Sequence, residues 1–480
     1  MMPNWAWGLC LVLLLTAITF AVNRYNKRAI AVAAFHNVIW GGAIALLGTG
    51  LIDYKEASVA SWLTLSVGLV AFNVGAVLAN FSSRSHRIDT GARADLSEGF
   101  SGRTEIVTRP MLAVLTAVYF AAFTIYLVLI EQRFGIATLF TDPVVIRGAS
   151  DPTYLEGIPL PVRVLLYIGP FLIAIFGYKE AVRNPLPIWL RLSAVALIAV
   201  SMFALLQRTN LFVGLLLLAA VLVTKPHKKA SGLAEPAAGV QARENLNSAK
   251  RKGKLRLGAG VALIGVVGFV AFQAIGGALG KEGGQALSTG AVSSTLERSG
   301  LTEPFIYYTG GVAAFLQLVD STNYEWPPDE FEGAILVGDY NPQTWGARTF
   351  SPILKVIPGI QRWNEINPFI DTAVWTNVFT SLEPFYRDFR ALGVAFGSTA
   401  VGFVIAWAYM RRFKSPRAFW LQAVLVSTLP FATFAFKLND TLTLVCLFLV
   451  LVLTLTLSPR VRGYLQRTRV DDRTEPNEAN

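Results

Sequence analysis

The side chains that could carry chemistry gather in one polar stretch, Lys281 to Arg390, in a chain otherwise made of apolar runs. This stretch combines carboxylates, aromatic rings and arginines, and acidic residues clearly outnumber basic ones. A carboxylate can accept the proton of a sugar hydroxyl, and a guanidinium can contact phosphate oxygens through two parallel hydrogen bonds. Flat aromatic faces suit the apolar faces of sugar rings. These residue types together suit transfer of a glycan from a lipid pyrophosphate, although any single carboxylate is more simply explained as part of a folded cap.

Arg208 is the most informative single residue outside that stretch. It interrupts the apolar run 188–224, within the sequence Gln207-Arg208-Thr209-Asn210. The run is longer than the ~20 residues that one spanning helix needs, so the chain must turn here. An arginine at a helix end commonly extends to the membrane interface, whereas ionisable groups bounded closely by apolar sequence are often functional. The residue alone leaves both interpretations open.

The sequence predicts no metal or cofactor site. His36 lies in an apolar run, and His86 and His227 lie in basic links, away from the polar stretch. The two cysteines, Cys10 and Cys446, lie inside apolar runs and read as small apolar residues. No Cys/His spacing typical of zinc is present in the sequence.

The composition is that of a membrane protein. Only 15% of the residues are charged and 53% are hydrophobic, whereas a soluble domain carries about 25% charged residues. We expect an all-α polytopic membrane protein with about 11 transmembrane helices and one large external (periplasmic) loop that carries short helices. The apolar runs are 5–22, 30–52, 58–81, 110–130, 162–179, 188–206, 209–224, 257–276, 391–410, 418–436 and 441–457.

Basic residues are concentrated in every second connection between these runs. These connections and the C-terminal tail together hold most of the 42 lysines and arginines. The positive-inside rule therefore places the N-terminus outside and the C-terminus in the cytoplasm. The basic excess is a topology signal, and we expect no nucleic-acid binding. The expected organisation is an N-terminal bundle of seven spans (1–224), a basic cytoplasmic linker (225–256), the eighth span (257–276), an external cap (277–390), three C-terminal spans (391–457) and a cytoplasmic tail (458–480).

Three stretches resemble the bacterial oligosaccharide repeat-unit polymerases, the Wzy-like O-antigen polymerase family. The first is the break Leu206-Gln207-Arg208-Thr209-Asn210-Leu211 between two spans. The second is Tyr307-Tyr308-Thr309-Gly310-Gly311, which leads into a short apolar helix. The third runs from Thr376-Asn377 through Pro384-Phe385-Tyr386-Arg387-Asp388-Phe389 to Gly393. The chain departs from the family where Arg390 replaces a glycine after Asp-Phe, which puts the local turn in doubt unless Gly393 supplies it.

The resemblance implies a GT-C-like bundle in the bacterial cytoplasmic (inner) membrane that transfers a glycan from undecaprenyl pyrophosphate to a new lipid-linked repeat unit without a metal or other cofactor. Arg208 would bind the pyrophosphate together with Arg387 or Arg348, and Asp388 or Glu383 would be the base or its orienting partner. Tyr307, Tyr308 and Tyr386 would line the sugar site, with Gly310, Gly311 and Asn377 in the same binding motifs. The implied partners are membrane lipid, the lipid-linked donor and acceptor, and a chain-length regulator and flippase of the same pathway.

Three other functions stay open at the level of sequence. A ligase of the O-antigen type shares the donor but uses another acceptor. A transporter or flippase of lipid-linked glycans is disfavoured by the long polar stretch and by the scarcity of charges deep in the apolar runs. A non-enzymatic scaffold of an envelope assembly is excluded by nothing in the sequence.

Overall fold

A computed structural model describes residues 2–25, 30–88, 104–143, 146, 158–205, 208–224, 291–321, 346–354, 357 and 370–456. Within these residues the chain is mainly helical, and its two sheets have only two short strands each. The α-helices are α1 (Asn4–Tyr25), α2 (Ile30–Leu47), α3 (Val59–Ile88), α4 (Arg109–Phe134), α5 (Thr138–Thr141), α8 (Leu160–Leu166), α9 (Ile168–Gly177), α10 (Ile188–Ala204), α11 (Arg208–Thr224), α13 (Ser294–Ser299), α14 (Thr302–Asp320), α15 (Ser351–Leu354), α16 (Glu383–Arg411), α17 (Pro416–Ser427) and α18 (Thr441–Thr456). The other elements are the 3₁₀ turns η2 (Lys179–Ala181), η4 (Leu429–Phe431) and η5 (Lys437–Asn439), and the strands β1 (Val107–Thr108), β2 (Val182–Arg183), β3 (Ile370–Asp371) and β4 (Trp375–Thr376).

Four helices of the described chain are long and apolar enough to cross a membrane. They are Asn4–Val22, Val59–Ser82, Arg109–Phe134 and Glu383–Arg411. Shorter apolar helices, of 10 to 17 residues, are Ala31–Leu47, Pro161–Gly177, Ile188–Ala204, Thr209–Thr224 and Thr441–Leu455. The mostly helical fold agrees with the expected all-α membrane protein. The number of about 11 spans stays a prediction, and the expected span 257–276 lies outside the described residues.

Two of the expected spans are interrupted by prolines. Pro170 lies in the first turn of α9, and a proline ring clashes with the carbonyl group four residues earlier, so α8 ends at Leu166. Pro430 acts in the same way after α17, which ends at Ser427 and is followed by η4. The expected runs 162–179 and 418–436 are therefore not single straight helices.

Helices α3 and α16 approach each other so closely that their backbones touch. A Cβ atom added at Gly75 would overlap the carbonyl oxygen of Thr399, and one added at Gly402 would overlap the carbonyl oxygen of Phe72. Small residues allow this kind of close crossing between helices in a membrane, where dispersion replaces the hydrophobic effect as the main attraction. The crossing fixes α16, the helix whose start carries the expected site residues Glu383, Tyr386, Arg387 and Asp388.

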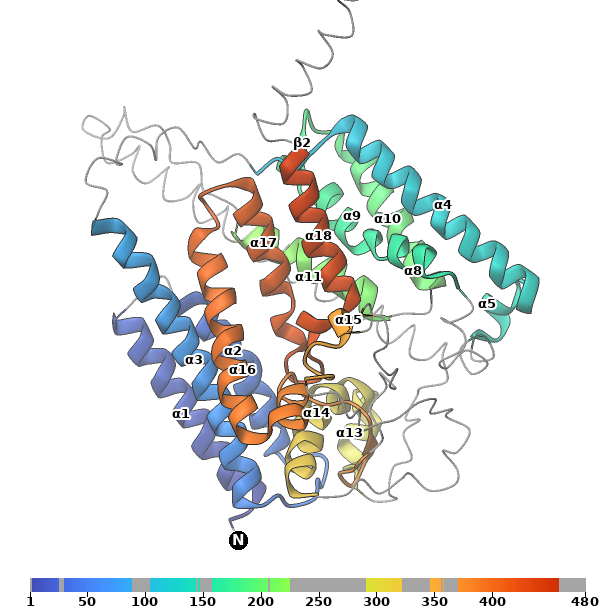
Figure 1. Ribbon diagram of the computed structural model, residues 1–480. Coiled ribbons are helices and arrows are strands. Elements are labelled where there is room, and N and C mark those ends of the chain that lie inside the picture. Colours follow the sequence, from blue (N-terminus) through green and yellow to red (C-terminus); the bar gives the residue numbers. More distant parts are fainter. Residues whose placement is uncertain are drawn as a thin grey trace, which may run out of the picture.

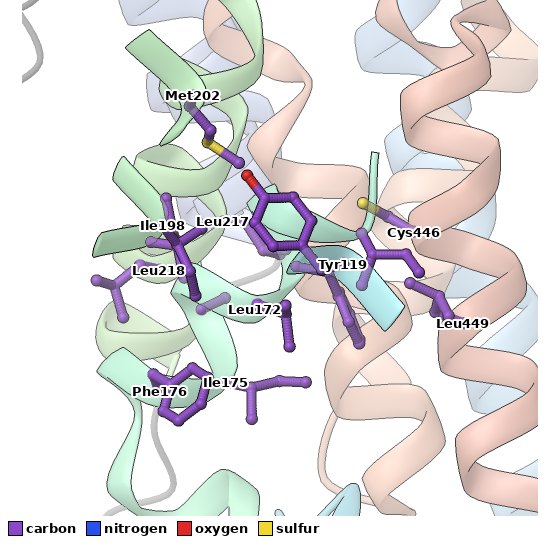
Figure 2. Close-up of a cluster of buried hydrophobic side chains, with 14 of the residues drawn as sticks. Tyr119, Leu172, Ile175, Phe176, Ile198, Met202, Leu217, Leu218, Cys446 and Leu449 are labelled. Atoms are coloured by element: carbon purple, nitrogen blue, oxygen red, sulfur yellow. The ribbon is translucent and has the colours of Figure 1, made fainter. Parts of the chain in front are cut away.

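The two largest clusters of buried side chains lie on opposite sides of the bundle. Helices α1, α2 and α3 share a core with α14 and the start of α16, through residues such as Trp62, Phe315 and Phe385. Helices α4 and α8 to α11 share a second core with α17 and α18. Figure 2 shows part of this second core, where Tyr119 lies among apolar side chains such as Leu172, Met202 and Cys446. The C-terminal helices thus connect the two halves.

The N-terminus lies at the same end of the bundle as α13 and α14 (Figure 1). The connection between α2 and α3 contacts both the N-terminus and the segment that leads into α13. Asn4 donates its backbone N–H to Glu56 at 2.8 Å, and Asp53 donates its N–H to the carbonyl of Ala291 at 2.8 Å. This end is referred to below as the Asn4 end.

The opposite end is built from the connections before α4, after α9 and before α17. Strands β1 and β2 pair there in parallel, with Val107 opposite Val182. The indole of Trp420 donates to the carbonyl of Thr104 at 2.8 Å. This grouping agrees with the two sides expected from the basic residues, while the assignment of one side to the cytoplasm stays a prediction.

Candidate active site

The start of α16 is positioned by the preceding segment. β3 and β4 form a hairpin in which Ile370 faces Thr376. The Ser381 N–H then donates to the carbonyl of Ala432 at 2.7 Å, and Thr380 Oγ1 accepts from the Leu382 N–H at 3.3 Å. Pro384 follows in the first turn of α16, where its missing N–H costs nothing. These contacts fix the direction in which Glu383 to Asp388 project.

Glu383 and Arg387 form an ion pair on one face of this first turn. Oε1 of Glu383 contacts Nε of Arg387, and the two side chains are only 6% and 8% exposed, respectively. The spacing of four residues with the acid first is the favourable order on a helix. The guanidinium also lies over the ring of Phe379, 5.4 Å from its centroid. A pair this deeply buried costs desolvation energy, so removal of either partner would leave an uncompensated charge.

Asp388 holds a second segment against the same turn. Its carboxylate accepts from the N–H groups of Arg348 at 3.3 Å and Thr349 at 2.7 Å. Nδ2 of Asn439 donates to the carbonyl of Arg348 at 2.8 Å. Arg348 is 6% exposed and is thus fixed between α16 and η5.

Arg390 makes the turn that the sequence left in doubt. Its φ of 57° and ψ of −150° interrupt the helical geometry of α16, in a region that is strained for residues other than glycine. The guanidinium lies 5.5 Å from the centroid of the Tyr386 ring. Gly393 does not have a positive φ. It instead provides room, because a Cβ there would overlap the carbonyl oxygen of Phe385.

The aromatic residues of α14 face two different neighbours. The Tyr308 hydroxyl donates to the carbonyl of Ile39 at 2.6 Å, which connects α14 to α2, and burial raises the pKa of this phenol. The Tyr307 ring meets the Phe434 ring edge-on with 6.4 Å between centroids. Gly311 lies directly against the carbonyl oxygen of Thr433, whereas Gly310 has only ordinary neighbours, Ile306 and Tyr54.

Tyr386 lies between Glu383 and Arg387 in the sequence, and Asn377 precedes both. The Tyr386 ring meets Phe315 of α14 edge-on at 5.9 Å, and its hydroxyl approaches the carbonyl of Val319 at 3.5 Å. Asn377 is half-buried between β4 and α16. The start of α16 therefore rests on α14.

The segment 429–436 contacts α14, the start of α16 and the first turns of α11. On one side, Phe212 and Val213 of the first turns of α11 cluster with Phe431 and Phe434. Gly311 and Tyr307 contact the same segment, as described above. On the α16 side, the Phe385 ring lies 4.9 Å from the Phe436 ring. Arg208 begins α11, and its side chain lies outside the described residues.

Several residues of this arrangement were missed by the sequence reasoning. The Tyr54 hydroxyl bonds Thr309 Oγ1 at 2.8 Å, and burial raises the pKa of this phenol as well. Asp320 accepts from the Ser58 N–H at 2.8 Å and from Ser61 Oγ at 2.5 Å, and so caps the start of α3. A serine three residues before a second serine at the start of an apolar run was the signal that could have located this helix start.

The described residues contain no group of three His, Cys, Asp or Glu side chains that could hold a metal ion. The expected residues Glu383, Asp388, Tyr386, Arg387 and Arg348 lie together around the start of α16. Tyr307, Tyr308, Gly310 and Gly311 lie on the adjacent helix α14. Their roles stay predictions, because position alone does not assign chemistry.

Comparisons with protein-family models, with curated proteins and with solved structures gave no match to the chain.

Proposed function

We propose that the protein is a membrane glycosyltransferase that polymerises undecaprenyl-pyrophosphate-linked oligosaccharide repeat units on the outer face of the bacterial cytoplasmic membrane. One observation carries the proposal. Two of the three stretches that resemble the Wzy-like polymerases, 307–311 and 376–393, contact the segment 429–436, and α11, which begins at Arg208 of the third stretch, contacts it through Phe212 and Val213. Unrelated short matches would have no reason to meet in one place.

The arrangement of the two ends supports the expected topology. The Asn4 end collects the N-terminus, the connection 53–57, α14 and the start of α16. In the proposal this end faces outward, where lipid-linked repeat units are polymerised. The basic residues of the described connections before α4, after α9 and before α17, such as Arg109, Arg183 and Lys414, lie at the opposite end, as the positive-inside rule requires of a cytoplasmic face. The proposed bundle has about 11 spans.

The proposed reaction joins an acceptor hydroxyl to the anomeric carbon of the donor glycan. The new C–O bond forms as the bond from that carbon to the pyrophosphate oxygen breaks. The leaving pyrophosphate gains negative charge, which Arg208, with Arg387 and Arg348, stabilises as it develops. The proton of the acceptor hydroxyl passes to a carboxylate, and the pyrophosphate leaves on its lipid.

The contacts of the two carboxylates indicate different roles for Asp388 and Glu383. Both oxygens of Asp388 accept backbone N–H groups, one of them that of Arg348, so Asp388 is assigned a positioning role. Glu383 is paired with the positive charge of Arg387. It is assigned the proton of the acceptor, with Arg387 holding its side chain in place. Tyr307, Tyr308 and Tyr386 provide the aromatic surface for the sugar.

The direct test uses purified protein in proteoliposomes supplied with lipid-linked repeat units, and products separated on a ladder gel. Arg208→Ala should lower the polymerisation rate by about 10²- to 10³-fold, the usual cost of losing an electrostatic stabiliser. The matched control is Arg298→Ala, since Arg298 is an exposed arginine on α13. A ladder at the wild-type rate from Arg208→Ala would remove Arg208 from the mechanism.

Two further variants separate the roles of the carboxylates. Glu383→Gln should lower kcat by about 10²- to 10⁴-fold, the range of general base catalysis. Asp388→Asn should act mainly on KM, because it displaces Arg348 without removing the proton acceptor. Addition of a single glycan to another acceptor would favour the ligase, and lipid movement without new bonds would favour the flippase.

A further inference from the structure

The turn between α16 and α17 lies at the end of the bundle opposite the candidate site (Figure 1). It carries four basic residues, which are Arg411, Arg412, Lys414 and Arg417. The sequence contains no aspartate or glutamate between Asp388 and Asp440. Residues 411–417, called the basic turn below, are therefore strongly positive.

The length of α16 places the basic turn at a membrane surface. A helix rises about 1.5 Å per residue, so the part of α16 from Arg390 to Arg411 is roughly 30 Å long, which matches the hydrocarbon layer of a typical bilayer. Helix α17 begins at Pro416 and returns into the bundle, where Phe419 and Trp420 are buried. The cations of the basic turn thus lie at the level of the lipid phosphate groups.

Aromatic rings hold the two adjacent arginines. The guanidinium carbon of Arg411 lies 4.1 Å from the centroid of the Trp407 ring. That of Arg412 lies 3.7 Å from the centroid of Tyr409 and 4.4 Å from the centroid of Phe413. A cation over a ring face is attracted by the π electrons, and tryptophan and tyrosine are enriched where helices leave the hydrocarbon layer. Both guanidinium groups are therefore restrained before any ligand binds.

The cations of the basic turn keep donors that other arginines of this fold use for structure. Arg191, for comparison, donates two hydrogen bonds of 2.7 Å to carbonyl groups at the end of α9. Arg411, Lys414 and Arg417 form no ion pair within the described residues. Nε of Arg411 is also buried without a hydrogen-bond partner there. A guanidinium with free N–H groups matches the oxygens of a phosphate through two parallel hydrogen bonds.

We infer that the basic turn binds the headgroup of an anionic phospholipid that carries two phosphate groups. The adjacent arginines bind one phosphate, and Lys414 and Arg417 bind the other. The acyl chains lie along α16, on which the apolar side chains of Val404 and Phe396 are exposed. Basic clusters at the end of a spanning helix are typical binding sites for lipids with several negative charges. The inference goes beyond the proposed function and does not rest on it, because the candidate site lies at the other end of α16.

The test measures lipid binding to the purified protein in detergent by native mass spectrometry, with tetraoleoyl cardiolipin as the probe. Arg411→Gln combined with Arg417→Gln removes one cation from each phosphate contact. This variant should bind cardiolipin about tenfold more weakly, a difference equivalent to about 1.4 kcal/mol. The control combines Arg183→Gln with Arg298→Gln, which changes the net charge equally at exposed positions outside the basic turn. It should bind like the wild-type protein.

A second variant serves if the first fails to fold. Lys414→Gln combined with Arg417→Gln changes only exposed side chains, and it should also weaken cardiolipin binding. Equal affinity of the wild-type protein and the folded basic-turn variant would overturn the inference, as would equal losses in that variant and in the control.

Further probes identify the ligand. Phosphatidylglycerol has one phosphate and should bind more weakly than cardiolipin, whereas uncharged phosphatidylcholine should not compete. Equal affinities for phosphatidylglycerol and cardiolipin would overturn the assignment to a lipid with two phosphates. Displacement of cardiolipin by an equal concentration of inorganic diphosphate would indicate a site for a soluble anion and would overturn the assignment to a lipid. None of these measurements depends on glycan transfer.

Discussion

Gly311 of α14 lies against the carbonyl oxygen of Thr433, whereas a methyl group at its neighbour Gly310 would make only ordinary contacts with Ile306 and Tyr54. Adjacent glycines of one motif therefore have different reasons to be glycine. Gly311 lets α14 touch the backbone of the segment 429–436, which also contacts α11 and α16.

Gly311→Ala should destabilise the protein by about 1–3 kcal/mol, the usual cost of forcing extra volume into a filled site. Gly310→Ala should be neutral or slightly stabilising, because an alanine favours a helix by about 1 kcal/mol over a glycine. Thermal unfolding of the two purified variants in detergent measures the difference. Equal melting temperatures would mean that α14 and the segment 429–436 are not in backbone contact.

Arg390→Gly should stabilise the protein relative to Arg390→Ala. Both substitutions remove the contact between the guanidinium and the Tyr386 ring, but only glycine adopts the backbone angles of this position without strain. We expect a difference of about 1 kcal/mol in the free energy of unfolding, at the low end of the cost of such strain. A more stable alanine variant would show that residue 390 does not adopt these backbone angles.

Asp320→Asn should lower the free energy of unfolding more than Asp371→Asn does. Asp320 caps α3 through Ser58 and Ser61, and loss of a helix cap costs about 0.5–2 kcal/mol. Asp371 pairs with Lys55 at 2.7 Å, but the two side chains are 33% and 50% exposed, and an exposed pair contributes about 1 kcal/mol or less. Limited proteolysis and thermal unfolding report both, and a larger effect of Asp371→Asn would contradict the assignment.

Alkaline pH should reduce the difference in the free energy of unfolding between the wild-type protein and Tyr54→Phe. Thr309 donates its hydroxyl to the carbonyl of Phe305 at 2.8 Å, so the Tyr54 hydroxyl is the donor in their shared hydrogen bond. Burial raises the pKa of Tyr54 in the folded state above the ~10 of an unfolded chain. Its contribution is thus complete below pH ~10 and declines as the pH rises through the folded-state pKa. Chemical unfolding between neutral pH and pH ~11 measures it, and a constant difference between the two proteins would show that Tyr54 is solvated.

The sequence predicted the helical class and most helix positions well, because long apolar runs have few structural alternatives in lipid. It predicted less well where runs break. Pro170 and Pro430 were visible as prolines, but whether a proline kinks or ends a helix depends on the packing around it. At Arg390 the break could be located from the sequence but its geometry could not. The arginine stands where the resembling polymerases have a glycine, and it adopts the strained backbone angles itself.

The candidate site was only partly predictable. Glu383 and Arg387 could be seen to share a helix face, because their spacing of four residues is that of one helical turn. The contacts of Asp388 with the N–H groups of Arg348 and Thr349 join distant segments, and no local pattern marks them. The connection 53–57 has only five residues, and nothing in its sequence marks it as an anchor. It nevertheless anchors the segment that starts at Ala291 and the helix α14.

The backbone contacts at Gly75 and Gly402 also determine how the molecule responds to the thickness of its bilayer. A span that does not match the hydrocarbon layer adjusts mainly by tilting. Helices α3 and α16 cannot tilt separately, because neither crossing contact has a side chain that could rotate out of the way. Because Asp320 of α14 also caps α3, a thinner or thicker membrane would tilt α3 and α16 together as one rigid unit.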